Sequence, residues 1–257
     1  MKVAIIGAGA MGGAIAEGAM KGQAAEEIIV SNPSSGKLKR FADAGARTTT
    51  DNRQAVAEAD MVVLAVKPWL VEVVLKEIRD LLTEEKTLVS VAAGISSEQL
   101  RQWSGGDCKI FIAIPNIAIA QRQSMTFITP VETLDEDIEK VKNFFDEMGE
   151  NCICDEEHLE AGMALASCGI AYAFRYIRAA SEGGVELGFK ARQSQEIVMQ
   201  TLKGAVALLE AEGLHPEEAI DQVTTPGGLT IKGLNEMEHA GFTSSVIRGL
   251  KACLNKA

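Results

Sequence analysis

The sequence of 257 residues has few aromatic residues and no long apolar run. Phe, Trp and Tyr together make up 5% of it. No apolar run approaches the roughly 20 residues that a membrane-spanning helix needs. The opening stretch, MKVAIIGAGAMGG, lacks the long apolar segment and the cleavage site of a signal peptide. We therefore expect a cytoplasmic protein without a membrane partner.

The cysteines are few and follow no regular spacing. Cys152 and Cys154 are too close together for a zinc knuckle, and no histidine pair accompanies them. An odd number without framework spacing argues against a set of disulfides. We expect reduced thiols, as in a cytosolic protein, and no bound metal. The five cysteines are Cys108, Cys152, Cys154, Cys168 and Cys253.

Basic residues are fewer than acidic residues. The chain carries 36 acidic and 25 basic residues, for a formal net charge of −11. This balance argues against nucleic acid or an anionic membrane as a partner, because both repel an acidic surface. Hydrophobic residues at 47% and charged residues at 24% are typical of a globular protein. The length suits one large domain or two ordinary ones.

The first half of the chain alternates between strand-like and helix-like segments. Short apolar runs predict strands at residues 2–6, 27–31, 61–66, 87–92 and 109–114, and amphipathic patterns predict helices at residues 12–20, 37–44, 69–82 and 97–103. Such alternation predicts right-handed crossovers and a mostly parallel sheet covered by helices. The predicted fold class is therefore α/β, with a Rossmann-type domain at residues 1–155.

A glycine-rich turn, GAGAMG, follows the first predicted strand. Gly7, Gly9 and Gly12 have the spacing of a dinucleotide-binding turn, with a strand before it and a helix after it. The helix N-terminus offers free N–H groups to the phosphates. A glycine-rich turn of another α/β protein is the alternative. The cofactor residues predicted here are Gly7, Ala8, Gly9, Ala10, Met11 and Gly12.

The residues after the second strand bear on the choice of cofactor. An NAD-selective domain usually places Asp or Glu about 20 residues beyond the turn, to bind the ribose 2′-hydroxyl. Here this place holds hydroxyl and amide side chains, and Lys37, Lys39 and Arg40 follow. We therefore predict NADP, with NADPH preferred over NADH; the alternative is that the three cations form a solvated helix face. The residues predicted to hold the ribose phosphate are Ser31, Asn32, Ser34, Ser35 and Lys37.

The second half of the chain is helical. Helical patterns cover residues 156–187, 191–211, 216–223 and 242–254, and Gly213 closes the second of them. Small residues are frequent in the first helix and allow close helix approach. A helical piece of this size with few aromatics needs a partner to complete its core. We expect a C-terminal all-helical dimerisation domain at residues 156–257 and a homodimer formed through it.

Several motifs resemble the pyrroline-5-carboxylate reductase family, and the similarity covers essentially the whole chain. The most specific motif is HPEEAIDQVTTPGGLTIKGLNEME at residues 215–238. Further motifs are AVKP at residues 65–68, SVAAGIS at 90–96, Pro115-Asn116, and QTLKGA at 200–205. The resemblance implies a Rossmann domain followed by a helical domain that interlocks with a second subunit, and leaves oligomers above the dimer open. It implies reduction of the cyclic imine 1-pyrroline-5-carboxylate to L-proline by NADPH or NADH, the last step of proline biosynthesis.

The resemblance also implies site residues. The loop from Thr224 to Thr230 would cradle the substrate, facing the nicotinamide of a partner subunit, and Thr230, the catalytic candidate, would place its hydroxyl by the ring nitrogen. A plain turn between helices is the alternative. The substrate residues implied are Thr225, Pro226, Gly227, Gly228 and Thr230. The further cofactor residues implied are Asn52, Ala65, Val66, Lys67, Pro68, Ala93, Gly94 and Asn116.

The reaction requires little of the side chains. A protonated imine is already electrophilic, so the protein must chiefly align donor and acceptor. We therefore expect no nucleophile, no metal and no strong general acid. Lys67 is expected to act through its backbone. The histidines, His158, His215 and His239, are expected to be structural.

Some positions depart from the family pattern and leave the exact substrate open. Ile112, Ile117, Ala118, Ser167 and Ile170 stand where the family has other residues. Arg122, Arg175 and Arg178 either pair with acids at an interface or mark a paralogue that reduces another cyclic imine or a small oxo acid. A β-hydroxyacid dehydrogenase is a weaker alternative, because the lysine of that family is missing after Tyr172. A non-enzymatic cofactor-binding protein also remains open.

Overall fold

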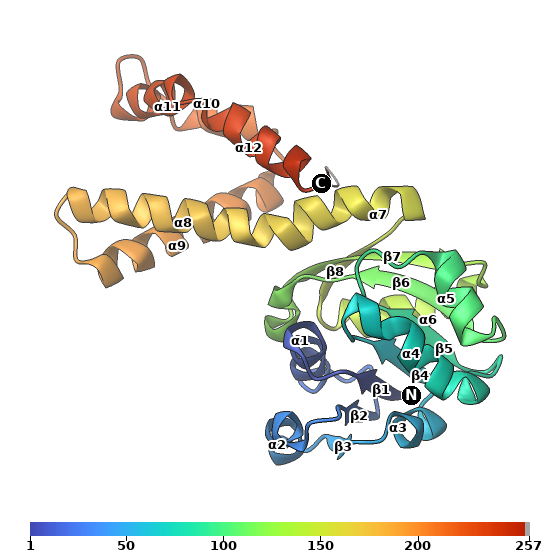
Figure 1. Ribbon diagram of the computed structural model, residues 1–257. Helices are drawn as coiled ribbons and strands as arrows, with labels where there is room; N and C mark the ends of the chain where they lie inside the picture. Colours follow the sequence, from blue (N-terminus) through green and yellow to red (C-terminus); the bar gives the residue numbers. More distant parts are fainter. Residues whose placement is uncertain (255–257) are drawn as a thin grey trace. The chain divides into compact units, whose positions relative to one another are not determined.

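The computed structural model describes residues 1–254 (Figure 1). The last three residues of the predicted second domain, 255–257, lie outside the described residues. The chain forms two compact units, Met1–Ser167 and Cys168–Ala257. The first holds the sheet, and the second is helical.

The first unit is built on one sheet of eight strands in the order β3-β2-β1-β4-β5-β6-β7-β8. The strands from β3 to β6 in this order are all parallel, β7 runs antiparallel to β6, and β8 runs parallel to β7. The predicted α/β class with a mostly parallel sheet is confirmed. The strands are β1 Lys2–Ile6, β2 Glu27–Ser31, β3 Arg47–Thr49, β4 Met61–Leu64, β5 Thr87–Ser90, β6 Lys109–Ile114, β7 Ser124–Val131 and β8 Gly149–Ile153.

Helices cover both faces of this sheet. Alternate residues of each strand point to opposite faces, so the sheet contributes side chains to two apolar clusters. Val3 and Ile5 of β1 belong to one apolar cluster, and Ala4 and Ile6 belong to the other. The first cluster takes its helical residues from α1 Ala10–Ala19, α2 Ser35–Asp43 and α6 Asp135–Asp146. The second takes them from α3 Asn52–Glu58, α4 Pro68–Ile78, α5 Ser97–Ser104 and α7 Glu156–Gly162. Strands buried on both faces explain the continuous apolar runs in the sequence.

Some predicted bounds were wrong. β4 and β5 end at Leu64 and Ser90, two residues earlier than predicted, because the chain turns into loops at that edge of the sheet. Helix α4 ends at Ile78, and a 3₁₀ turn, Arg79–Leu81, follows it. The prediction also lacked β3, β7, β8 and α6. The β8 sequence, GENCI, is largely polar and lies at the edge of the sheet, so it carries no buried apolar pattern.

The second unit consists of helices. The helix predicted over residues 156–187 is divided by a π-helical stretch, Met163–Cys168, between α7 and α8. Gly213 takes a φ of +63° and closes α9, as predicted. The helices of this unit are α8 Gly169–Glu186, α9 Ala191–Glu212, α10 Pro216–Gln222, α11 Leu229–His239 and α12 Phe242–Ala252.

The helical unit has almost no core of its own. Among residues 168–254, Ser194 alone is buried. Large apolar side chains face outward, including Phe174 at 60% exposure and Leu187 at 83%. So much exposed apolar surface is typical of a region that packs against another chain. Within residues 1–254, no helix combines the length and apolar character needed to cross a membrane.

Candidate active site

The predicted cofactor residues of the first unit follow the carboxyl ends of neighbouring strands. Gly7–Gly12 follows β1, Ala65–Pro68 follows β4, Ala93 and Gly94 follow β5, and Asn116 follows β6. These strands are adjacent and parallel, so the segments meet at one edge of the sheet. The strand order reverses between β1 and β4, where doubly wound sheets open a crevice for a dinucleotide. The topology therefore brings these predicted segments together.

The glycine-rich turn needs glycine at two of its positions for steric reasons. Gly7 has a φ of +105°, and a Cβ there would lie 2.7 Å from the carbonyl oxygen of Ala65. A Cβ on Gly12 would overlap the carbonyl oxygen of Gly7 and lie 2.9 Å from the Cβ of Ala65. The Gly7 N–H donates a 2.8 Å hydrogen bond to the carbonyl of Ser31. Glycine at these positions lets α1 pack tightly on β1 and β4.

The start of α1 suits an anionic ligand. Gly9 is its N-cap, no acidic residue lies in its first turn, and the space around a Cβ on Gly9 is open. The first N–H groups of a helix, here those of Ala10, Met11 and Gly12, have no acceptor inside the helix. Together with the helix dipole they favour negative charge at this point. These residues therefore fit the pyrophosphate of a dinucleotide.

Asn32 supports the turn. Its Oδ1 accepts a 3.2 Å hydrogen bond from the Ala8 N–H, and its Nδ2 donates to the Ser34 carbonyl at 3.2 Å. The side chain is buried. Both ends of this amide are thus engaged in holding the turn after β1 against the turn after β2.

Of the three predicted cations, two have acidic partners. Lys39 pairs with Asp43 at 2.6 Å, and Arg40 pairs with Glu17 at 2.7 Å. Lys37 makes no ion pair within residues 1–254 and lies in the first turn of α2. Ser34 is the N-cap of this helix, yet its hydroxyl makes no capping bond. Lys37 is therefore the cation that remains available beside a helix N-terminus.

A carboxylate that the prediction overlooked lies beside two of the predicted cofactor residues, Ser31 and Asn52. The Ser31 hydroxyl donates a 2.7 Å hydrogen bond to Oδ1 of Asn52, and Nδ2 of Asn52 donates to Oε2 of Glu77 at 3.0 Å. Glu77 is on α4, 25 residues beyond Asn52. No local sequence pattern connects Glu77 with the segment after β2, so the sequence alone gives no sign of this contact.

Backbone geometry shapes the other end of the crevice. Lys67 is the N-cap of α4 and accepts a 2.8 Å hydrogen bond from the Leu70 N–H through its carbonyl, while Pro68 occupies the first turn. Gly94 takes a φ of +75° in the loop after β5. These residues offer backbone atoms more than reactive side chains.

Asn116 is buried at the end of β6. Its Oδ1 accepts a 2.9 Å hydrogen bond from the Ala118 N–H, its Nδ2 donates to the Ala166 carbonyl at 3.4 Å, and its own N–H donates to the Ser124 hydroxyl at 3.1 Å. The side chain therefore fixes the wall of the crevice after β6.

The three unusual arginines differ in their environment. Arg122 has a positive φ of 59°, and its guanidinium donates to the Glu147 carbonyl at 2.5 Å and to Oε2 of Glu147 at 3.0 Å. Its acidic partner therefore lies in the same unit and not across an interface. Arg178 pairs with Glu182 one turn further along α8, at 2.7 Å. Arg175 makes no ion pair among the described residues.

The predicted substrate loop connects α10 to α11. Gly227 takes a φ of +72°, in the region that favours glycine. Gly228 does not, with a φ of −64°; a Cβ there would instead lie 3.0 Å from the Thr225 carbonyl, which accepts the Gly228 N–H at 2.9 Å. The Thr224 hydroxyl donates to the Asp221 carbonyl at 3.2 Å and so closes α10.

Thr230 lies in the first turn of α11, not in the loop as predicted, because the helix begins at Leu229. Its side chain is exposed, and its hydroxyl makes no hydrogen bond within residues 1–254. It lies beside the unpaired N–H groups of a helix N-terminus. A free hydroxyl next to free N–H groups can bind a small anionic molecule with a polar ring atom.

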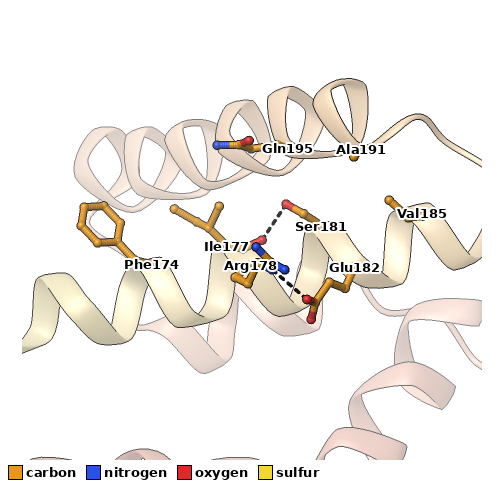
Figure 2. Close-up of a pocket in the computed structure, with 8 residues that line it drawn as sticks. All are labelled: Phe174, Ile177, Arg178, Ser181, Glu182, Val185, Ala191 and Gln195. Carbon is orange, nitrogen blue, oxygen red and sulfur yellow. Dashed lines mark hydrogen bonds and ion pairs between the residues drawn. The ribbon is translucent and has the colours of Figure 1, made fainter.

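The helical unit also has two apolar grooves. One, of about 560 Å³, lies between α8 and α9, where Phe174, Ile177 and Val185 line it (Figure 2). The Ser194 hydroxyl joins the two helices by a 2.8 Å hydrogen bond to the Ser181 carbonyl. The second groove, of about 550 Å³, lies among α8, α11 and α12. Grooves so apolar on helices without a core suit contact with another protein chain.

The glycine turn at the switch point of a doubly wound sheet, with a helical unit that has almost no core, defines a class: a dinucleotide-binding α/β domain joined to helices with an exposed apolar surface. Residues 2–94 match the family model described as NADP oxidoreductase coenzyme F420-dependent, and residues 156–257 match pyrroline-5-carboxylate reductase dimerisation. The chain belongs to the pyrroline-5-carboxylate reductase family.

Individual relatives agree with this assignment. The chain is 38% identical to pyrroline-5-carboxylate reductase 1 of Dictyostelium discoideum over 99% of its own length, although it spans only 49% of that relative. It is 33% identical to pyrroline-5-carboxylate reductase of Glycine max, covering 98% of this chain and 93% of the relative. The structure of the Plasmodium falciparum pyrroline carboxylate reductase with NADP bound is similar with a TM-score of 0.90, at 25% identity, covering 98% of this chain and 95% of the other.

These findings confirm the predicted family, the fold class, the oxidoreductase class and a nicotinamide cofactor. They also confirm a helical region that serves homo-oligomerisation and a small molecule as substrate. The alternatives of a paralogous reductase and a non-enzymatic binding protein are not favoured. The roles of the individual site residues stay predictions.

Proposed function

We propose that NADPH is the hydride donor with which this family member reduces 1-pyrroline-5-carboxylate to L-proline, the last step of proline biosynthesis. The observation that carries the choice of NADPH is Lys37. This lysine has no acidic partner among residues 1–254 and lies in the first turn of α2. Near it is Ser34, the N-cap of the helix, whose hydroxyl makes no capping hydrogen bond. A 2′-phosphate at this helix N-terminus would gain both the cation and the free N–H groups. A 2′-hydroxyl would gain far less.

The proposed cofactor site runs along the edge of the sheet. The first N–H groups of α1 bind the pyrophosphate, Ser31 and Asn52 border the ribose of the adenosine, and the backbone of Ala65–Pro68, with Ala93, Gly94 and Asn116, forms the wall by the nicotinamide. Open space at Gly9 and tight packing at Gly7 and Gly12 support this arrangement. When bound there, the cofactor supplies a hydride for the imine carbon.

The proposed role of the loop before α11 is to hold the imine. The turn from Thr225 to Gly228 and the first N–H groups of α11 bind the substrate carboxylate, and Thr230 directs its hydroxyl to the ring nitrogen. The exposure of Thr230 and the absence of any bond to its hydroxyl within residues 1–254 support this role. No charged side chain has to transfer a proton to the carbon, because the protonated imine already accepts hydride.

The proposed domains are a cofactor domain at residues 1–155 and a helical domain at residues 156–257. Two copies pair through the helical domains, and the loop of one copy serves the cofactor of the other. The exposed apolar residues of α8 to α12 support such pairing. The free state of all five cysteines supports the reducing environment of the cytoplasm, and the net charge of −11 argues against nucleic acid and anionic membranes as partners.

The test is a comparison of kcat/KM for NADPH and NADH with 1-pyrroline-5-carboxylate as the second substrate. We expect kcat/KM for NADPH to exceed that for NADH by roughly 10- to 100-fold, because a charge-assisted hydrogen bond contributes roughly 1.5–3 kcal/mol. Equal or better use of NADH would overturn the proposal. Light scattering at micromolar protein should find a dimer or a larger oligomer, and an active monomer would overturn the shared site.

A further inference from the structure

Glu77 is linked by hydrogen bonds through Asn52 to Ser31, at the proposed ribose end of the cofactor site. The Asn52 amide is held at both ends, since its oxygen accepts from the Ser31 hydroxyl at 2.7 Å and its nitrogen donates to the Glu77 carboxylate at 3.0 Å. A carboxylate can only accept hydrogen bonds, so it fixes which way the amide points. Glu77 thereby turns the NH₂ group of Asn52 toward α4 and its oxygen toward the end of β2.

The position of Glu77 is itself fixed. Arg53, the neighbour of Asn52, donates to the backbone carbonyl of Glu77 at 2.6 Å and binds Asp80 through two hydrogen bonds of 2.6 and 2.7 Å. These bonds tie the start of α3 to the end of α4.

The charge of Glu77 is not neutralised by an ion pair. Glu77 forms no ion pair within residues 1–254; the Arg53 guanidinium, which binds Asp80 and the Glu77 backbone, attracts its charge only from a longer distance. One neutral amide separates its negative charge from Ser31. Ser31 ends β2, the place where dinucleotide-binding domains distinguish a 2′-hydroxyl from a 2′-phosphate. A negative charge here repels a phosphate and leaves a hydroxyl unaffected.

We propose that Glu77 sets the margin by which the enzyme prefers NADPH over NADH. As a positioning residue it holds Asn52 toward the ribose, and its charge weakens the binding of the 2′-phosphorylated cofactor alone. Lys37 and Glu77 then act in opposite directions on the same phosphate. The inference rests on the proposed function, because it takes Ser31 and Asn52 as the ribose end of the site.

The test uses three variants of the full chain. Glu77→Gln removes the charge and keeps an acceptor for Asn52, whereas Glu77→Ala removes both. Glu72→Gln removes a charge from the same helix at a residue that pairs with Lys76 at 2.6 Å and does not contact Asn52. The dissociation constants of NADPH and NADH are measured for each variant by titration, with thermal unfolding as the check on folding.

We expect Glu77→Gln to bind NADPH about 2- to 10-fold more tightly, because a nearby like charge is lost, and to bind NADH unchanged. Glu77→Ala should weaken NADH severalfold, because Asn52 loses its orientation. Glu72→Gln should change neither constant. If Glu77→Gln changes the dissociation constants of both cofactors equally, or leaves that of NADPH unchanged, the role of Glu77 is overturned and the proposed function is not affected. An unmutated protein that binds neither cofactor would overturn the proposed function and this inference with it.

Discussion

Gly12 lies so close to the carbonyl oxygen of Gly7 that no Cβ fits between them. Gly9, two residues after Gly7, has open space at the corresponding position. The two glycines therefore serve different purposes in one turn. Gly12 is required by the packing of α1, and Gly9 leaves room for a ligand.

This difference predicts that two alanine variants affect different properties, one the stability of the protein and the other its affinity for the cofactor. Gly12→Ala should destabilise the protein by about 1–3 kcal/mol, because backbone and Ala65 must shift to admit the methyl group. Gly9→Ala should leave the unfolding temperature unchanged and weaken NADPH binding by about tenfold or more, since the methyl group enters the space of the pyrophosphate. Thermal unfolding and cofactor titration distinguish the two. A stable Gly12→Ala protein with unchanged affinity would contradict the packing argument.

Lys37 should increase kcat/KM for NADPH by binding its 2′-phosphate. Lys37→Ala should lower kcat/KM for NADPH by roughly 10- to 100-fold, the range expected for the loss of a charge-assisted contact, and leave kcat/KM for NADH unchanged. Lys39→Ala is the matched control, because Lys39 is two residues away and is engaged with Asp43 at 2.6 Å. Equal losses in the two variants would mean that neither cation binds the phosphate specifically.

Thr230 should matter for turnover and not for cofactor affinity. Thr230→Val keeps the side-chain shape and removes the hydroxyl, so kcat/KM for the imine should fall roughly 10- to 100-fold, since a hydrogen bond felt in the transition state is worth about 1–3 kcal/mol. Thr224→Val is the control, because the Thr224 hydroxyl bonds only to the Asp221 carbonyl in the structure described. If Thr230→Val works at the unmutated rate, the turn before α11 merely joins two helices.

Asp137 should make the stability of the sheet unit depend on pH. Burial alone would raise the pKa of its carboxyl group, but hydrogen bonds from Lys109 at 3.0 Å and Lys140 at 3.2 Å outweigh this and lower the pKa. A lowered pKa in the folded state means that the charged form stabilises the fold above the unfolded pKa near 3.9 and loses this effect as the pH falls.

Asp137→Asn should therefore lower the free energy of unfolding at pH 7 by about 1–2 kcal/mol, because Lys109 and the half-exposed Lys140 lose their charged partner but remain accessible to water. The difference from the unmutated protein should shrink as the pH approaches 3. Urea unfolding at both pH values measures this, and a difference that is the same at pH 7 and pH 3 would argue against a role for the charge.

The sequence predicts those parts of the fold that depend on local pattern. β1, β4 and β5 were predictable because each has a run of buried apolar residues: VAII in β1, MVVL in β4 and LV in β5. β7 was not, because it buries polar residues such as Thr126 and Thr129, whose hydroxyls bond to Ser124 and to the Cys154 carbonyl. Such partners are known only once the fold is known.

The site divides in the same way. The glycine turn is visible in the sequence because its three glycines are close together and follow a strand. The bond between Asn52 and Glu77 is not visible, because it joins two helices 25 residues apart whose relative placement depends on the packing of the sheet. The start of α11 at Leu229 was missed for a different reason: the Pro-Gly-Gly turn gives no signal that Thr230 already belongs to the helix.

The conversion of 1-pyrroline-5-carboxylate to proline can be measured by following the oxidation of NADPH by the purified enzyme on addition of this imine, with proline quantified as the product. We predict cofactor oxidation that depends on this imine and yields one proline for each NADPH consumed, at a higher kcat/KM than with 1-pyrroline-2-carboxylate or piperideine carboxylates. A protein that binds NADPH tightly and oxidises none of it with 1-pyrroline-5-carboxylate would contradict the proposed reductase activity.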